Sequence, residues 1–174
     1  VMLIKFAVKN FRGFAERIEW DLSHPSNYSF NTYAVKDGVI KNGIIYGPNG
    51  SGKSNFALAI FDIEYHLSVK WKKADYLSNY VYIGNPNSPV EFEYVFKFGN
   101  DILEYRYSKN ASGMLIAESL VANNKQVFKR ENDVFEIDDD QFRIDATVKE
   151  NFKQNVNSVS VINFLTASFP FPQD

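Results

Sequence analysis

Residues 47–54 read Gly-Pro-Asn-Gly-Ser-Gly-Lys-Ser and place two glycines, a lysine and a hydroxyl at the spacing G-x-x-x-x-G-K-S. Glycines let the backbone turn tightly and aim several N–H groups at one point, where they can hold phosphate oxygens. The Lys53 ammonium would reach the β- and γ-phosphates, and the Ser54 hydroxyl would be a Mg²⁺ ligand. The motif therefore predicts a nucleoside triphosphate site, with ATP and Mg²⁺ as the expected cofactors.

The predicted phosphate cradle consists of residues of the loop and of the start of the helix, which offer backbone N–H groups, a charge or a hydroxyl. Its members are Gly47, Asn49, Gly50, Ser51, Gly52, Lys53, Ser54 and Asn55. A helix N-terminus behind the loop would add unpaired N–H groups and the positive end of its dipole. The alternative is a glycine-rich turn that only joins a strand to a helix, and it leaves the four matched positions unexplained.

The flanking sequence supplies the elements that such a loop needs. Residues 39–46 are rich in isoleucine and predict a short buried strand ahead of the loop. Behind it, Phe56, Ile60, Ile63 and Leu67 are spaced four, three and four apart, which predicts a helix over about residues 53–70. The order strand, loop, helix is the setting in which this motif binds phosphate.

Other acidic residues are weaker candidates for chemistry. Residues 58–62 resemble, in letters, the Walker B strand that ends in an acid, but they lie inside the predicted helix. Asp62 is therefore expected to be a solvated helix residue. Residues 138–140 are three aspartates at the expected edge of a β-meander, where a turn is the simpler interpretation. No catalytic residue is predicted in this chain.

Histidine, tryptophan and base-reading residues add little. His24 and His66 each stand alone and are expected to be structural or on the surface, and Trp20 and Trp71 are expected to pack. The guanine-reading motif N-K-x-D is absent, because the Asn-Lys pair at 124–125 lacks the following Asp. The choice between ATP and GTP stays open on the motifs, and ATP is the commoner choice.

Strand periodicity dominates the rest of the chain. Residues 3–8 and 17–22 predict a hairpin around a turn at residues 10–14, and residues 23–37 read as a loop. From residue 90 to 137 apolar residues alternate with polar ones between short turns, which predicts an antiparallel meander of about five strands. The expected fold class is α/β, a P-loop NTPase with an antiparallel β-meander subdomain.

The whole chain of 174 residues is expected to be one N-terminal ATP-binding lobe. Within it we assign residues 1–82 to a P-loop core, 83–140 to the meander and 141–174 to a return to the core. Formal net charge is −2, which argues against an overall positive field that would attract nucleic acid. Cysteine is absent, which excludes disulfides and thiolate metal sites. No apolar run approaches the roughly 18 residues of a membrane span, so a cytoplasmic protein without a membrane partner is expected.

The sequence resembles the N-terminal part of the ABC-type ATPases grouped with RecF, SMC and the OLD-like proteins. The nearest likeness is to bacterial AAA-type ATPases of that group, many of them linked to phage (antiviral) defence. Three features carry the resemblance: residues 2–14 are similar to the family's first strand and its "NFRSF" turn, residues 46–55 match its "YGxNxSGKSN" form, and residues 90–137 look like its β-lobe. Gly13 departs from the family's usual Ser.

The resemblance implies that the P-loop core and its β-meander are lobe I of an ABC ATPase, and it implies further properties. A basic residue of the opening turn lies near the nucleotide in this family, which maps onto Arg12 as a further nucleotide-binding residue; an ordinary surface turn residue is the equal alternative. Family members hydrolyse ATP as head-to-head dimers, with a signature motif, a Walker B Asp-Glu and a switch His from a C-terminal half. None of these is found here, and the Q-loop Gln is unassignable among Gln126, Gln141, Gln154 and Gln173.

Three functions follow as expectations. The first is the ATP·Mg²⁺-binding half of an ABC/SMC-like ATPase that continues beyond Asp174 and acts as a homodimer or higher oligomer; this chain alone would be inactive. The second is a nucleotide-dependent switch or scaffold that controls a partner effector, such as a nuclease, with little turnover. The third and weakest is a small-molecule kinase, for which the chain's five arginines offer no Arg-rich lid. DNA binding is open for a full-length protein and is not indicated by these residues.

Overall fold

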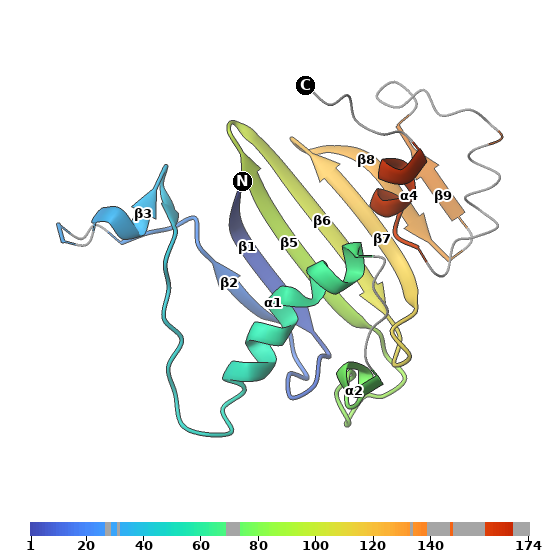
Figure 1. Ribbon diagram of the computed structural model, residues 1–174, viewed down its shortest axis with the longest axis horizontal. Helices are drawn as coiled ribbons and strands as arrows, with labels where there is room; N and C mark the ends of the chain where they lie inside the picture. Colours follow the sequence, from blue (N-terminus) through green and yellow to red (C-terminus); the bar gives the residue numbers. More distant parts are fainter. Residues whose placement is uncertain are drawn as a thin grey trace.

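A twisted antiparallel sheet organises the part of the chain that the computed structural model describes, namely residues 1–26, 29–30, 32–68, 74–132, 134–138, 147 and 159–168 (Figure 1). Within these residues its seven strands lie in the order β2-β1-β5-β6-β7-β8-β9. The strands are β1 (Met2–Lys9), β2 (Ile18–Asp21), β5 (Val90–Phe98), β6 (Asp101–Lys109), β7 (Leu115–Ala122), β8 (Lys125–Glu131) and β9 (Val134–Ile137).

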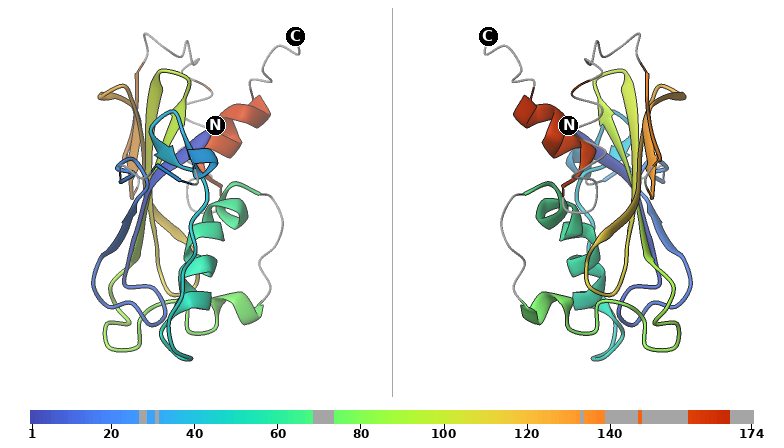
Figure 2. Two further views of the ribbon diagram at one scale, coloured as in Figure 1. Left: turned by 90° about the vertical axis from the view of Figure 1, so that its left-hand side faces the viewer. Right: turned by 90° about the vertical axis from the view of Figure 1, so that its right-hand side faces the viewer.

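Within the described ranges, the α-helices that have several consecutive described residues lie on one face of this sheet (Figure 2). They are α1 (Lys53–Leu67), α2 (Ala74–Leu77) and α4 (Val161–Ser168). A small two-stranded ribbon, β3 (Val35–Lys36) with β4 (Val39–Ile40), follows a 3-10 turn η1 (Thr32–Ala34) and stands beyond the β2 edge (Figure 1). From β4 the chain runs along the β2 side of the sheet and then turns back into α1 (Figure 1).

The core lies between the sheet and α1, and aromatic rings fill much of it. Strand residues of one parity face the helix, because successive side chains of a strand alternate between its two faces. Phe92 and Tyr107 are cross-strand partners with ring centroids 5.0 Å apart. Phe6 of β1 contacts both Tyr94 and, edge-on, Phe56 of α1. The buried aromatic side chains of the sheet thus form the surface on which α1 packs.

The predicted fold class is wrong. Every strand pair among the described residues is antiparallel, so the molecule is mostly an antiparallel β-sheet with helices on one face and not an α/β protein with a parallel sheet. The prediction depended on a buried strand over residues 39–46, but the strand ends at Ile40. Ile44 and Tyr46 are 90% and 91% exposed, so their apolar character did not signal burial.

Several local predictions are confirmed. The five strands β5 to β9 form the antiparallel meander, β1 and β2 form the hairpin, and a helix begins at Lys53. The meander continues the N-terminal sheet, because β5 pairs with β1 from Lys9↔Glu91 to Met2↔Lys97. Most of the expected return to the core at residues 141–174 lies outside the described residues, as does Trp71. No helix in the described ranges is long and apolar enough to cross a membrane.

The turn between β1 and β2 is fastened to the rest of the molecule by Asn10 and Arg12. The Asn10 amide donates to the carbonyl oxygens of Asn85, Ser88 and Pro89. Both Asn10 (φ 58°) and Arg12 (φ 49°) adopt the left-handed conformation, which is uncommon for non-glycine residues and which a tight turn requires. The anchored turn brings the neighbouring Phe14 against the start of α1.

Candidate functional site

The loop at residues 47–52 is built on two glycines with left-handed backbones. Gly50 has φ 80° and Gly52 has φ 95°, a region that L-residues rarely adopt and glycine reaches without cost. The Ser51 N–H donates to the Pro48 carbonyl oxygen at 3.3 Å, which closes a turn, and Gly52 is the N-cap of α1. The sequence thus produces a tight turn that leads directly into a helix N-terminus.

The N–H groups in the first turn of α1 have no acceptors within the helix and point out of its N-terminal end. The first helical bond here is from the Phe56 N–H to the Gly52 carbonyl oxygen, at 2.8 Å. Lys53, Ser54 and Asn55 are the residues ahead of that bond. Their N–H groups lie at the positive end of the helix dipole, which favours an anion.

Lys53 folds back over the loop. Its Nζ donates to the carbonyl oxygens of Gly47 and Pro48, each at 2.7 Å, and lies 3.5 Å from the Ser51 hydroxyl. These bonds hold the one cation of the motif at the mouth of the turn rather than extended into solvent. An arriving phosphate would find both the ammonium and the helix N–H groups on the same loop.

The opening turn packs against this loop. A Cβ placed on Gly52 would lie 3.0 Å from Cε1 of Phe14, and one placed on Gly13 would lie 3.5 Å from Nδ2 of Asn55. Two segments separated by about forty residues in the sequence, and both predicted to matter, are therefore neighbours. A glycine at position 52 is required both for its φ and for the close approach of Phe14.

An open pocket of about 460 Å³ lies beside the loop. One part of its lining comes from the loop and α1, and the other from β2, the opening turn and the segment before the loop. The lining residues are Phe14, Glu19, Trp20, Ile45, Tyr46, Gly47, Pro48, Ser51, Gly52, Lys53 and Phe56. Sequence reasoning selected Gly47, Ser51, Gly52 and Lys53 of these and missed the aromatic members.

The other predicted site residues lie near the pocket or point away from it. Asn49 and Gly50 are exposed in the turn and Ser54 is exposed on the first turn of α1. The Arg12 guanidinium donates to the Tyr76 carbonyl oxygen at 2.8 Å and lies over the Phe11 and Tyr76 rings. In this structure Arg12 therefore holds α2, and its part in nucleotide binding stays a prediction.

Asp62 corrects one expectation. It lies in α1 as predicted, but its side chain is fully buried rather than solvated. The carboxylate is ion-paired with Lys109 of β6 and accepts hydrogen bonds from the hydroxyl groups of Tyr76, Tyr80 and Tyr107. Burial, followed by the Asp62 charge, raises the pKa of Tyr76 and Tyr80 well above the usual range. These partners make Asp62 a structural residue that is removed from the pocket.

A second buried network joins α1 to the far strands. The His66 ring is 2.7 Å from the Tyr105 hydroxyl, which donates to Glu118 at 2.6 Å. Glu118 also pairs with Arg130 and accepts the Val161 N–H at the start of α4. Burial raises the pKa of Glu118, against these bonds, and lowers that of Arg130. His66 is thus a buried structural histidine, as the sequence allowed.

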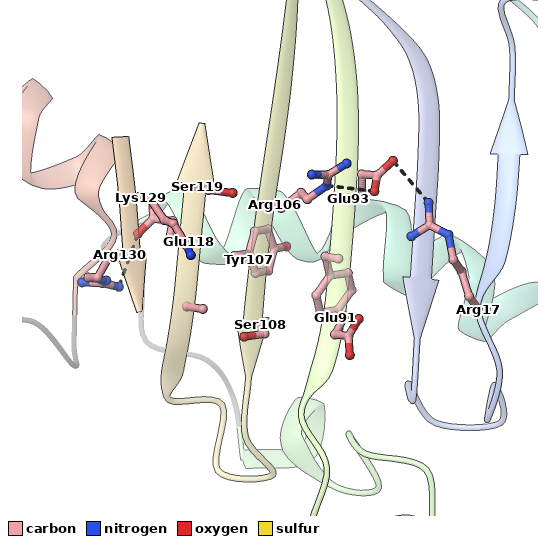
Figure 3. A pocket seen from close by; sticks show the side chains of 12 residues that line it. Arg17, Glu91, Glu93, Arg106, Tyr107, Ser108, Glu118, Ser119, Lys129 and Arg130 are labelled. Atoms are coloured by element: carbon pink, nitrogen blue, oxygen red, sulfur yellow. Dashed lines mark hydrogen bonds and ion pairs between the residues drawn. The ribbon is translucent and has the colours of Figure 1, made fainter. Parts of the chain in front are cut away.

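Figure 3 shows a second hollow, of about 240 Å³, in which Glu93 and Arg106 lie on the sheet face away from α1. Glu93 pairs there with Arg17 at 3.2 Å and with Arg106 at 3.0 Å. Burial opposes ionisation of Glu93, but the bonds to Arg106 and Arg17 outweigh it and lower the pKa of this carboxyl. Because these arginines already carry a carboxylate partner, the hollow is a weaker anion site than the loop.

Metal ligands do not gather within the described residues, where no three His, Cys, Asp or Glu side chains form a group that could hold an ion. A Mg²⁺ at the loop would thus take most of its ligands from phosphate and water, as Mg²⁺ commonly does, with Ser54 as the candidate protein ligand.

A comparison with protein-family models and a search of curated proteins find no match to this chain.

Proposed function

We propose that this chain binds ATP with Mg²⁺ at residues 47–54, as the nucleotide-binding part of an ATPase of the RecF/SMC/OLD-like kind. The observation that carries the proposal is the loop itself: two left-handed glycines turn the chain into α1, and Lys53 lies across the mouth of that turn. A backbone of this shape gathers N–H donors and a positive charge at one place, which is what a triphosphate requires.

Lys53, the loop backbone and Ser54 each contact a different part of the bound MgATP. Lys53 leaves the Gly47 and Pro48 carbonyl oxygens and pairs with the β- and γ-phosphates, the loop N–H groups hold the phosphate oxygens, and Ser54 is a Mg²⁺ ligand. Turnover would need a Walker B acid, a signature motif and a second copy, as the resemblance implies. The protein would be cytoplasmic and would act as a homodimer or higher oligomer.

A nucleotide-dependent switch or scaffold is the second candidate. It requires no hydrolytic acid beside the loop, and Asp62, whose segment resembles a Walker B strand in letters, is held by Lys109 and three tyrosines away from the pocket. Binding would then assemble a complex with an effector without rapid hydrolysis. Steady-state turnover of the full-length protein separates the two candidates: rapid hydrolysis that Lys53→Ala abolishes favours the ATPase.

Calorimetric titration of the chain with ATP and with GTP, each with and without Mg²⁺, tests the proposal directly. We expect Mg²⁺-dependent binding that Lys53→Ala reduces by on the order of a hundredfold, the scale of a charge-assisted hydrogen-bonded contact. Lys41→Ala is the matched control, because Lys41 is an exposed lysine on the segment leading to the loop. Equal affinities for the two variants would contradict the proposal.

A further inference from the structure

The pocket beside residues 47–52 has an aromatic wall that phosphate binding alone does not require. We propose that Trp20 is the platform for the base of the bound nucleotide, so that the site takes a nucleoside triphosphate in preference to a bare polyphosphate. This inference rests on the proposed phosphate site at the same loop. It adds a specificity-determining residue that lies some thirty positions before that loop in the sequence.

Trp20 is fixed at the junction of three elements. On β2 it is the cross-strand partner of Phe6, so its side chain is on the α1 side of the sheet. Its ring centroid lies 5.6 Å from that of Phe56, in the first turn of α1, at an interplanar angle of 60°. The indole is therefore held against the same helical turn that carries Lys53 and Ser54.

The segment that leads into the loop also passes this ring. A Cβ placed on Gly43 would lie 2.9 Å from Cζ2 of Trp20, closer than side-chain contacts normally come. Only glycine at position 43 lets the backbone approach the edge of the indole so closely. Trp20 thus sets the path of the loop as well as the wall of the pocket.

Packing does not consume the whole indole. Trp20 is only half-buried, and it lines the pocket together with Tyr46, Phe14 and Lys53. The pocket's volume of about 460 Å³ lies within the usual range of small-molecule sites, roughly 300–1,000 Å³. A phosphate group at the loop would leave an aromatic surface beside it that is suited to a purine or pyrimidine ring. Stacking of this kind accepts every base, because each has a π-face.

The experiment compares MgATP with magnesium tripolyphosphate, which has three linked phosphates and neither ribose nor base. In the wild-type chain we expect ATP to bind at least about tenfold more tightly, the scale of one base stacked on an aromatic ring. Trp20→Ala should bring the ATP affinity down to that of tripolyphosphate and leave tripolyphosphate binding unchanged. Trp20→Phe keeps a ring against Phe56 and should retain part of the preference, which guards against a folding defect in the alanine variant.

Fluorescence gives an independent reading. The chain has two tryptophans, so a Trp71→Phe variant reports on Trp20 alone. ATP should change this emission strongly and tripolyphosphate should not. Equal affinities of the wild type for the two ligands, or an equal loss of both with Trp20→Ala, would overturn the inference while leaving the phosphate site intact. If neither ligand binds, or if Lys53→Ala changes neither affinity, the proposed function itself fails.

Discussion

The Asp62 carboxylate of α1 and the Lys109 ammonium of β6 form an ion pair in which both side chains are almost completely removed from solvent. The pair ties the helix that follows the candidate phosphate loop to the middle of the sheet. A buried pair of this kind is costly to break from one side, because the remaining charge stays buried without its partner.

Asp62→Ala should therefore destabilise the chain by about 3–5 kcal/mol. Three tyrosine hydroxyls would lose their acceptor together with Lys109, which places the loss toward the upper end. Urea denaturation followed by circular dichroism measures the change. Glu64→Ala is the matched control, because Glu64 is an exposed acid on the same helix and should change stability by less than about 0.5 kcal/mol. A small effect at position 62 would show that the pair contributes little.

The buried tyrosines predict a loss of stability at high pH. Burial raises the pKa of Tyr76, Tyr80, Tyr94, Tyr105 and Tyr107 in the folded chain, whereas in the unfolded chain tyrosine ionises near pH 10. The unfolded state therefore gives up protons first. Stability is complete below about pH 10 and falls as the pH rises above it, by up to about 1.4 kcal/mol per pH unit for each tyrosine.

Urea midpoints measured between about pH 8 and 11 check this prediction. Tyr107→Phe removes one of the titrating groups, so its stability should fall less steeply with pH even though the variant starts from a lower value. A pH slope identical to that of the wild type would mean that Tyr107 does not contribute.

Glu118 joins β7 to Arg130 of β8 and to the N-terminus of α4. Glu118→Ala leaves the Val161 N–H without this acceptor and removes the carboxylate partner of Arg130, so we expect a loss of about 3–5 kcal/mol. Hydrogen exchange at Val161 and Phe164 should accelerate beyond the global change. Glu118→Gln keeps an acceptor for the Val161 N–H without the charge, and its exchange at Val161 should be slower than in the alanine variant.

Alanine substitutions at Gly52 and Gly38 separate the effect of backbone strain from the effect of contact with Phe14. Both have left-handed backbones, at φ 95° and φ 76°, but a Cβ at position 52 meets Phe14 at 3.0 Å, whereas one at position 38 meets nothing within 4 Å. Gly38→Ala should cost about 1–2 kcal/mol of backbone strain and leave ATP binding unchanged. Gly52→Ala should displace Phe14 or the loop and weaken ATP binding by at least tenfold, about 1.4 kcal/mol. Calorimetric titration of both variants distinguishes these outcomes.

Local pattern predicted the strands of this chain better than it predicted their assembly. The two-residue alternation from Val90 onward gave the meander, because successive side chains of a strand turn alternately toward the helices and away from them. The same kind of apolar signal failed at Ile44 and Tyr46, which lie exposed in an extended segment. Composition cannot say whether an apolar run finds a partner, and the predicted α/β class depended on that run.

The buried face of α1 shows a related limit. Apolarity selected Phe56, Ile60, Ile63 and Leu67, which are only partly buried, whereas Ala59, Asp62 and His66 are the most buried residues of the helix. Asp62 and His66 can be buried because distant strands supply Lys109 and tyrosine hydroxyls. Those partners lie about forty residues away, so no local pattern could reveal them.

The candidate site divides in the same way. The loop residues were readable from spacing alone, since one short segment supplies the glycines, the lysine and the helix N-terminus. Trp20 and Phe14 reach the pocket only because β2 pairs with β1 and the anchored turn lies against Gly52. Residues 17–22 predicted the strand that carries Trp20 but could not say what would lie opposite its ring.

The pairing of β1 with β5 also fixes an order of events during synthesis. Lys9 and Glu91 are register partners more than eighty residues apart, and the phosphate loop and α1 lie between them in the sequence. During synthesis, β1 can pair only with β2 until β5 has emerged. The aromatic side chains of β5 and β6, on which α1 packs, are likewise made after α1. The loop and α1 thus gain their sheet partners only after β5 and β6 have been made, and distant contacts of this kind slow folding.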